Sequence, residues 1–148
     1  MRPEDLDRIT AVNYTAPYLI SRAASRVMLR GGGGRIVNIG SIWSLVTKPG
    51  RSAYSASKAG LAGMTRSAAV DLAREGVLVN CVSPGFVLTD LSRSTMSESE
   101  RRTLAEVVPV GRFAEPAEIA PLVLFLCSDA NTYITGQNIA IDGGFTNV

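Results

Sequence analysis

The chain has 148 residues, a length that suits one compact domain, and 46% of them are hydrophobic against 19% charged. That proportion of apolar residues argues against a disordered chain. The net charge of +2 comes from 15 basic and 13 acidic residues with no basic run, which argues against a nucleic-acid partner. Histidine is absent, which excludes histidine-based catalytic triads, and we expect no metal site.

The amino-terminal residues are charged and carry no apolar signal segment. The longest apolar stretch, near Ile119–Cys127, is too short to span a bilayer. We therefore expect a cytoplasmic protein with no membrane partner. The two cysteines, Cys81 and Cys127, both lie in largely apolar stretches, and we expect both to be buried free thiols.

The first predicted element is a long helix that begins near Pro3, where a proline and two acidic residues suit a first turn. Apolar residues at helical spacing continue it to four successive glycines at 31–34. Those glycines could suggest a phosphate-binding loop, but no helix follows at once and no Lys-Ser/Thr pair is present. A flexible turn from helix to strand is the better interpretation.

Strands and helices then alternate. We predict a β-branched strand at Arg35–Gly40, a helix rich in small residues at about Ala53–Arg74, and a nearly continuous apolar strand at Val77–Ser83. Such an apolar run is typical of a parallel strand that is covered on both faces. The chain therefore belongs to the α/β class, with a parallel sheet.

The rest of the chain is predicted to hold two helices and one strand. Residues Phe86–Met96 form a loop in this interpretation, after which Ser97 and Glu100 have the spacing of a capping box. A second helix runs from Glu115-Pro116 to about Cys127, and a last short strand covers Asn138–Asp142.

Three residues have side chains suited to proton transfer. Tyr54 and Lys58 are four apart on a predicted helix and so share one face, while Ser41 ends a parallel strand, where open α/β sheets place their ligands. A lysine cation favours the phenolate form of a nearby tyrosine, which makes the tyrosine usable as an acid or base. A serine hydroxyl can donate to a carbonyl, whereas a hydride must come from a cofactor.

These features resemble the short-chain dehydrogenase/reductase family, in particular its 3-oxoacyl-(acyl-carrier-protein) reductase type. The resemblance follows the whole chain in family-like order, and its motifs are Val12-Asn13, Arg35–Ser41, Tyr54–Gly60, Val79–Gly85, Gly111-Arg112, Glu115–Ile119, Tyr133–Gln137 and Asp142–Gly144.

The resemblance implies a set of site residues. Tyr54 is the proton donor or acceptor, Lys58 assists it and binds the nicotinamide ribose, Ser41 orients the substrate carbonyl, and Asn13 holds a water in a proton relay. Pro84, Gly85, Val87 and Thr89 match the segment that holds the nicotinamide of NAD or NADP, and Trp43 is expected to line the substrate pocket. The implied activity interconverts a ketone and a secondary alcohol, in a homo-oligomer formed through the two long helices.

The sequence departs from the family in one large respect. It contains no strand followed by a glycine-rich pyrophosphate loop. We therefore expect a partial Rossmann-type, doubly wound parallel sheet with the last three strands and their helices, the first four strands being absent. Residues 1–148 would form one domain, the catalytic half, with weak or no activity alone. The alternative is a non-catalytic remnant that acts by associating with complete family members.

Overall fold

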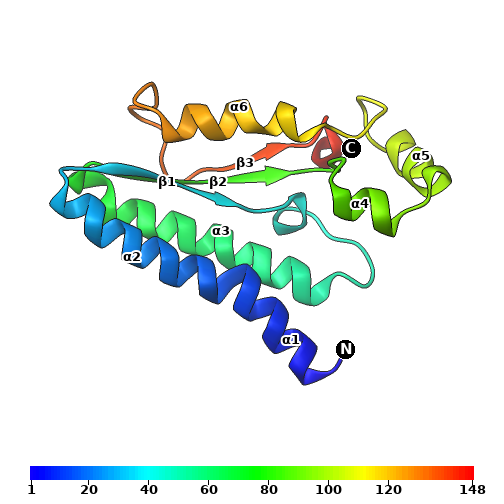
Figure 1. Ribbon diagram of the computed structural model, residues 1–148, viewed down its shortest axis with the longest axis horizontal. Helices are drawn as coiled ribbons and strands as arrows, with labels where there is room; N and C mark the ends of the chain where they lie inside the picture. Colours follow the sequence, from blue (N-terminus) through cyan, green and yellow to red (C-terminus); the bar gives the residue numbers. More distant parts are fainter.

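In the computed structural model, which describes residues 1–148, helices alternate with three parallel strands (Figure 1). The elements in chain order are α1 (Pro3–Thr10), η1 (Ala11–Thr15), α2 (Ala16–Arg30), β1 (Gly34–Ile39), η2 (Ile42–Ser44), α3 (Ser52–Leu72), η3 (Ala73–Glu75), β2 (Val77–Pro84), α4 (Asp90–Thr95), α5 (Glu98–Glu106), α6 (Pro116–Cys127), β3 (Asn138–Ile141) and η4 (Phe145–Asn147).

The sheet has the order β1-β2-β3, and helices lie on both of its faces. Figure 1 shows α1, α2 and α3 on one face and α6 on the other, with α4 and α5 beyond the carboxyl ends of the strands. The α/β class and the parallel sheet predicted from the alternating pattern are confirmed. The outer edge of β1 pairs with no strand.

The central strand β2 supplies the core. Val77 and Val79 pack with Ala69 of α3 on one face, and Val82 packs with Ile119 and Leu126 of α6 on the other. Because both faces are covered, apolar residues do not alternate with polar ones along this strand. The prediction of a strand buried on both faces is confirmed.

The predicted first helix exists, but it is not regular throughout. Between α1 and α2 the chain makes a π-helical turn, η1, and the helix then continues to Arg30 and ends at Gly31. Nothing in the spacing of apolar residues distinguishes a π turn from ordinary α-helix. Such turns are frequent at functional sites.

Two predicted elements need correction. The α-helix expected to reach Arg74 ends at Leu72, and a short 3-10 turn follows, which Gly76 closes with a left-handed φ of 75°. The segment expected to be a loop through Met96 contains α4, which starts with a reciprocal cap between Thr89 and Ser92. The third residue of this helix is a serine, whereas the capping-box pattern has glutamate or glutamine there, so the sequence pattern did not predict the cap.

The cysteines also differ from each other. Cys81 is a fully buried free thiol on β2, as predicted, but Cys127 is exposed, so the expectation of burial was wrong there. It is the last residue of α6 and lies off the face that packs on the sheet, although its neighbour Leu126 is buried. None of the helices has the length and hydropathy needed to cross a membrane.

Candidate active site

Ser41 follows the carboxyl end of β1 in an extended conformation and begins η2. Its hydroxyl oxygen accepts a hydrogen bond from the main-chain N–H of Trp43 at 3.3 Å, and it donates to no protein atom. The residue before it must be small, because a Cβ on Gly40 would lie 2.7 Å from the sulfur of Cys81. Ser41 is buried, with 7% of its surface exposed, and its proton is free to bind a ligand oxygen.

Tyr54 and Lys58 lie one turn apart near the start of α3, and both are partly exposed. The Lys58 Nζ is 5.9 Å from the centre of the Tyr54 ring and donates a 2.9 Å hydrogen bond to the main-chain carbonyl of Ile39. Burial lowers the pKa of the Lys58 ammonium group below its ordinary value. The lysine therefore connects α3 to β1 at the point where the strand ends and Ser41 follows shortly after.

Asn13 belongs to the π turn η1 and faces α3. Its amide nitrogen donates to the hydroxyl of Ser57 at 3.3 Å, and Ser57 in turn donates to the main-chain carbonyl of Tyr54 at 2.7 Å. This chain of hydrogen bonds joins the first helix to the turn of α3 that carries the tyrosine. The resemblance predicted a role for Asn13 but gave none to Ser57, although Ser57 lies within the Tyr54–Gly60 motif.

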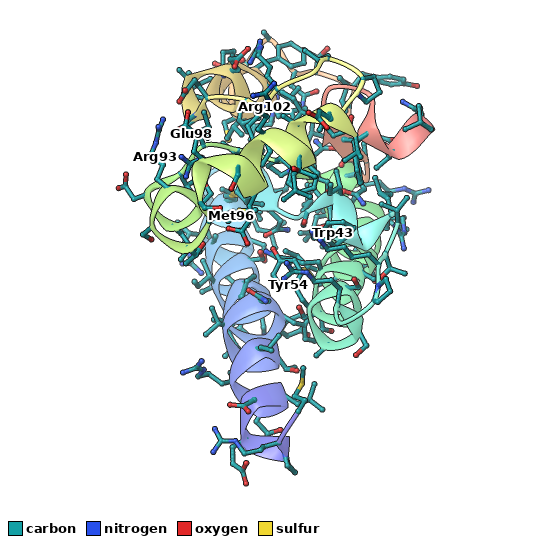
Figure 2. The ribbon with its side chains drawn as sticks, turned by 90° about the vertical axis from the view of Figure 1, so that its right-hand side faces the viewer. Trp43, Tyr54, Arg93, Met96, Glu98 and Arg102 are labelled. Carbon is teal, nitrogen blue, oxygen red and sulfur yellow. The ribbon has the colours of Figure 1, made fainter.

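The carboxyl ends of the strands bring these groups to one side of the molecule. Figure 2 looks onto that side and shows Tyr54 and Trp43 there, with Arg93 and Met96 on the neighbouring α4 segment. Ser41 and Lys58 join them through the contacts with Trp43 and Ile39. The position agrees with the general rule that open parallel sheets bind ligands outside the carboxyl ends of their strands.

The segment after β2 lies beside α6. Gly85 is required there, because a Cβ would lie 2.8 Å from the Cα of Asp142. Val87 forms an isolated parallel bridge with Ala114, and Thr89 caps α4. The backbone of this segment is thus fixed at three successive points.

Three of the four residues expected to hold a nicotinamide line one groove. Pro84, Val87 and Thr89 form one wall of a cavity of about 570 Å³, and apolar residues of α6 form the other. The wall residues from α6 and its first turn are Pro116, Ile119, Ala120, Val123 and Leu124. A largely apolar groove of this size, with few polar groups, has the general character of a small-molecule site.

Trp43 is part of an aromatic cluster. Its ring meets those of Phe86 and Phe145 edge-to-face at centroid distances of 6.3 and 5.9 Å, and the Nζ of Lys48 lies 5.5 Å from its centroid. Phe86 also stacks on Phe113 at 5.1 Å. The residue expected as a pocket wall is therefore held by the carboxyl-terminal turn η4, a contact that the sequence did not predict.

The described residues contain no group of three or more histidine, cysteine, aspartate or glutamate side chains that could hold a metal ion. Two titratable side chains, Tyr54 and Lys58, lie near the carboxyl end of β1, and the Asp142 carboxylate, which accepts from the N–H groups of Gly144 and Thr146, directly follows β3. Burial also raises the pKa of the Cys81 thiol, which lies beneath Gly40.

A family model described as enoyl-(acyl carrier protein) reductase matches residues 1–146. Curated relatives include the 3-oxoacyl-(acyl-carrier-protein) reductase FabG of Rickettsia felis, 39% identical over 148 residues, and that of Aquifex aeolicus, 43% identical over 140 residues. These matches cover 100% and 95% of this chain, but 61% and 56% of the relatives. The chain belongs to the short-chain dehydrogenase/reductase family and is similar to the 3-oxoacyl-(acyl-carrier-protein) reductases of that family.

Solved structures show the same relation. A gluconate 5-dehydrogenase from Burkholderia cenocepacia, solved in complex with NADP and tartrate, superposes with a TM-score of 0.95 at 30% identity and matches 100% of this chain and 58% of its own. Acetoin dehydrogenase from Enterobacter cloacae gives a TM-score of 0.89 at 37% identity and matches 99% of this chain and 57% of its own. The chain thus spans about three fifths of the length of these relatives.

Proposed function

We propose that this chain carries the proton-transfer centre of an oxidoreductase that uses NAD or NADP to interconvert a ketone and a secondary alcohol. The observation that supports it best is the contact of Lys58 with the end of β1, which holds the lysine beside the Tyr54 ring and near Ser41. The curated relatives are named as reductases of 3-oxoacyl groups, which makes a 3-oxoacyl compound the first substrate class to try.

Each residue has a defined task in this proposal. The Ser41 proton is donated to the substrate oxygen, and Tyr54 gives or takes the proton that the alcohol oxygen needs. The Lys58 cation, 5.9 Å from the centre of the Tyr54 ring, binds a ribose hydroxyl. Asn13, which reaches α3 through Ser57, holds a water that returns the proton to solvent.

The residues after β2 fit the nicotinamide end of the cofactor. The groove wall of Pro84, Val87 and Thr89 is apolar apart from the threonine hydroxyl, and Gly85 allows the backbone to approach closely. When bound there, the cofactor supplies the hydride that no side chain can supply. The chain contains no glycine-rich loop to bind the phosphates, so the fit extends only to the nicotinamide end.

We further propose that residues 1–148 form one domain, equivalent to the last three strands of the family's Rossmann-type sheet and their helices. Two features support this. The outer edge of β1 is unpaired, and a groove of about 310 Å³ beside it is lined by apolar residues of α2 and β1. Ile20 and Ile39, both in that groove, are 68% and 49% exposed.

Association through the two long helices is part of the proposal. A groove of about 330 Å³ lies between α2 and α3 and is lined by Tyr14, Tyr18, Met64 and Ala68, among others. Large apolar side chains of the first helix also face outward, at Val12, Leu19 and Val27. A second copy that covers them would remove this surface from water.

A non-catalytic protein that binds complete family members is the second candidate, and the unpaired edge of β1 favours it. Fluorescence of Trp43, the single tryptophan, separates the two candidates. In a titration with NADPH and with NADH, quenching at micromolar cofactor supports the oxidoreductase. No quenching up to millimolar cofactor supports the non-catalytic candidate.

Turnover tests the chemistry directly. The purified chain is assayed for NAD(P)H-dependent reduction of a 3-oxoacyl ester, with Tyr54→Phe as the test variant and Tyr133→Phe, at a 94% exposed residue, as the matched control. Loss of an acid–base group lowers turnover by about 10²–10⁴-fold. Measurable turnover in the wild type that Tyr54→Phe retains in full would contradict the assignment of Tyr54.

A further inference from the structure

A small polar cluster lies directly behind η2, in the layer between that turn and the sheet. It consists of three side chains from three separate elements: Ser44 of η2, Ser83 of β2 and Asn138 of β3. The Ser83 hydroxyl lies 2.6 Å from Oδ1 of Asn138, the Asn138 Nδ2 lies 2.9 Å from the Ser44 hydroxyl, and the two hydroxyls are 3.3 Å apart. Ser83 is fully buried, and Ser44 and Asn138 are partly buried.

The protons in this cluster can be assigned from the distances. The Asn138 Oδ1 can only accept, so Ser83 donates its single proton there. The Ser44 hydroxyl donates its own proton to the main-chain carbonyl of Ser41 at 2.7 Å, and it therefore accepts from Nδ2 of Asn138. With both hydroxyl protons used, the 3.3 Å approach of the two serines is a contact only.

The observed orientation of the Asn138 amide leaves the Ser44 proton available for the Ser41 carbonyl. If the amide were turned over, its oxygen would need the Ser44 proton, and the carbonyl of Ser41 would lose that donor. In the observed orientation every buried polar side-chain atom has a partner. A fully satisfied network of this kind holds its members in one arrangement, whereas a partly satisfied one does not.

Ser44 connects this cluster to Ser41 through hydrogen bonds. Both its N–H, at 2.9 Å, and its hydroxyl, at 2.7 Å, donate to the Ser41 carbonyl, which closes the turn. The same turn presents the N–H of Trp43 to the hydroxyl oxygen of Ser41. The direction in which the free Ser41 proton can point therefore depends on where η2 is held.

We propose that Asn138 is a positioning residue for Ser41, acting through Ser44 to fix the turn that aims the serine hydroxyl. The consequence for catalysis rests on the proposed oxidoreductase function, but the effect on the turn does not. Asn138 makes no contact with the groove or with Tyr54 and Lys58 among the hydrogen bonds of the structure, so it acts on the site only through η2.

The test is amide hydrogen exchange of the segment 40–46, with Trp43 fluorescence as a second readout, in the purified chain without cofactor. Asn138→Asp keeps the acceptor for Ser83 and removes the donor to Ser44, while Asn138→Leu removes both. Loss of one hydrogen bond predicts roughly tenfold faster exchange of the Ser44 amide in either variant. Greater quenching of Trp43 by acrylamide is expected alongside it.

Asn131→Leu is the matched control. Asn131 is also buried and hydrogen-bonded, but its partners lie in and around the loop that joins α6 to β3, at Leu126 and Ile134. Exchange in 40–46 should be unchanged in this variant even though its overall stability falls. Equal acceleration in Asn131→Leu and Asn138→Asp would show a global effect and overturn the proposal.

Ser44→Ala covers the case in which an Asn138 variant fails to fold. It should accelerate exchange in the same segment, and the double variant Ser44→Ala/Asn138→Asp should add little, because both changes break one connection. Unchanged exchange in the single variants, or additive effects in the double, would overturn the positioning role.

If the wild type reduces a ketone, Asn138→Asp should lower kcat with little change in KM. Absence of turnover in the wild type would count only against the proposed function.

Discussion

The Nζ of Lys58 donates a 2.9 Å hydrogen bond to the carbonyl of Ile39, and this contact ties the first half of α3 to the end of β1. It places a cation beside the Tyr54 ring, at a point of β1 that lies two residues along the chain from Ser41. Partial burial disfavours the charged form of a lysine side chain, so the free energy of unfolding depends on pH. The contact therefore has a consequence that can be measured without substrate.

Stability should rise with pH through the titration of Lys58. Burial lowers the pKa of this group in the folded chain, whereas the unfolded chain keeps a value near 10.5. Between the two values the unfolded state binds more protons, so the free energy of unfolding increases with pH. Urea denaturation of the wild type and Lys58→Met from pH 7 to 10.5 should show the wild type gaining stability relative to the variant.

The difference between the two proteins isolates Lys58 from other groups that titrate in this range. Lys48→Met, which removes an exposed lysine, is the control and should follow the wild type in its pH dependence. A constant difference between wild type and Lys58→Met across the range would contradict the lowered pKa.

A methyl group at position 85 should destabilise the fold. The Cβ of Gly85→Ala would lie 2.8 Å from the Cα and Cβ of Asp142, so the backbone would have to move to relieve the close contact. Such overpacking costs about 1–3 kcal/mol. Thermal and urea denaturation measure this cost.

Gly63→Ala is the matched control for that substitution. Gly63 lies inside α3, and a Cβ added there would meet only the Arg66 guanidinium, at 3.8 Å. Alanine in place of glycine within a helix stabilises by about 0.5–1 kcal/mol. The two substitutions should therefore have opposite signs, and a Gly85→Ala protein as stable as the wild type would refute the close approach to Asp142.

The pair of Arg112 and Glu118 should contribute to stability at neutral pH and lose that contribution in acid. Arg112 approaches both carboxylate oxygens at 2.7 Å and holds the pKa of Glu118 at about 2, against 4.5 for the ordinary group. Because the folded-state pKa is lowered, the contribution is present above pH 4.5 and disappears as the pH falls towards 2. Both side chains are exposed, so the effect should be small and salt-dependent.

Urea denaturation of the wild type and Glu118→Gln between pH 7 and 2.5 measures this effect. The two proteins should differ most at pH 7 and converge in acid. A difference that grows as the pH falls would contradict the assigned direction.

The two thiols should react at very different rates. Cys127 is exposed, whereas Cys81 is fully buried and burial raises its pKa. One equivalent of a thiol reagent should react in the native chain and two after denaturation. Cys127→Ser should abolish the fast reaction, and Cys81→Ser should leave it intact; two fast equivalents in the native wild type would contradict the burial of Cys81.

Much of the architecture follows from the sequence by itself. The run of apolar residues from Val77 determines a strand that must be covered on both faces, and the Ser97–Glu100 cap and Pro116 begin helices where the pattern predicted them. Tyr54 and Lys58 share a face because their spacing matches one helical turn, whatever surrounds them. These features are local, so chain order alone specifies them.

Only the tertiary structure determined the features that depend on contacts between distant segments. The bond from Lys58 to Ile39, the path from Asn13 through Ser57, and the cluster of Ser44, Ser83 and Asn138 each join elements far apart in sequence. The exposure of Cys127 also depends on which face of α6 meets the sheet. A polar side chain reveals its partner only when the fold brings the partner within hydrogen-bonding distance, and residue type and spacing along the chain carry no such information.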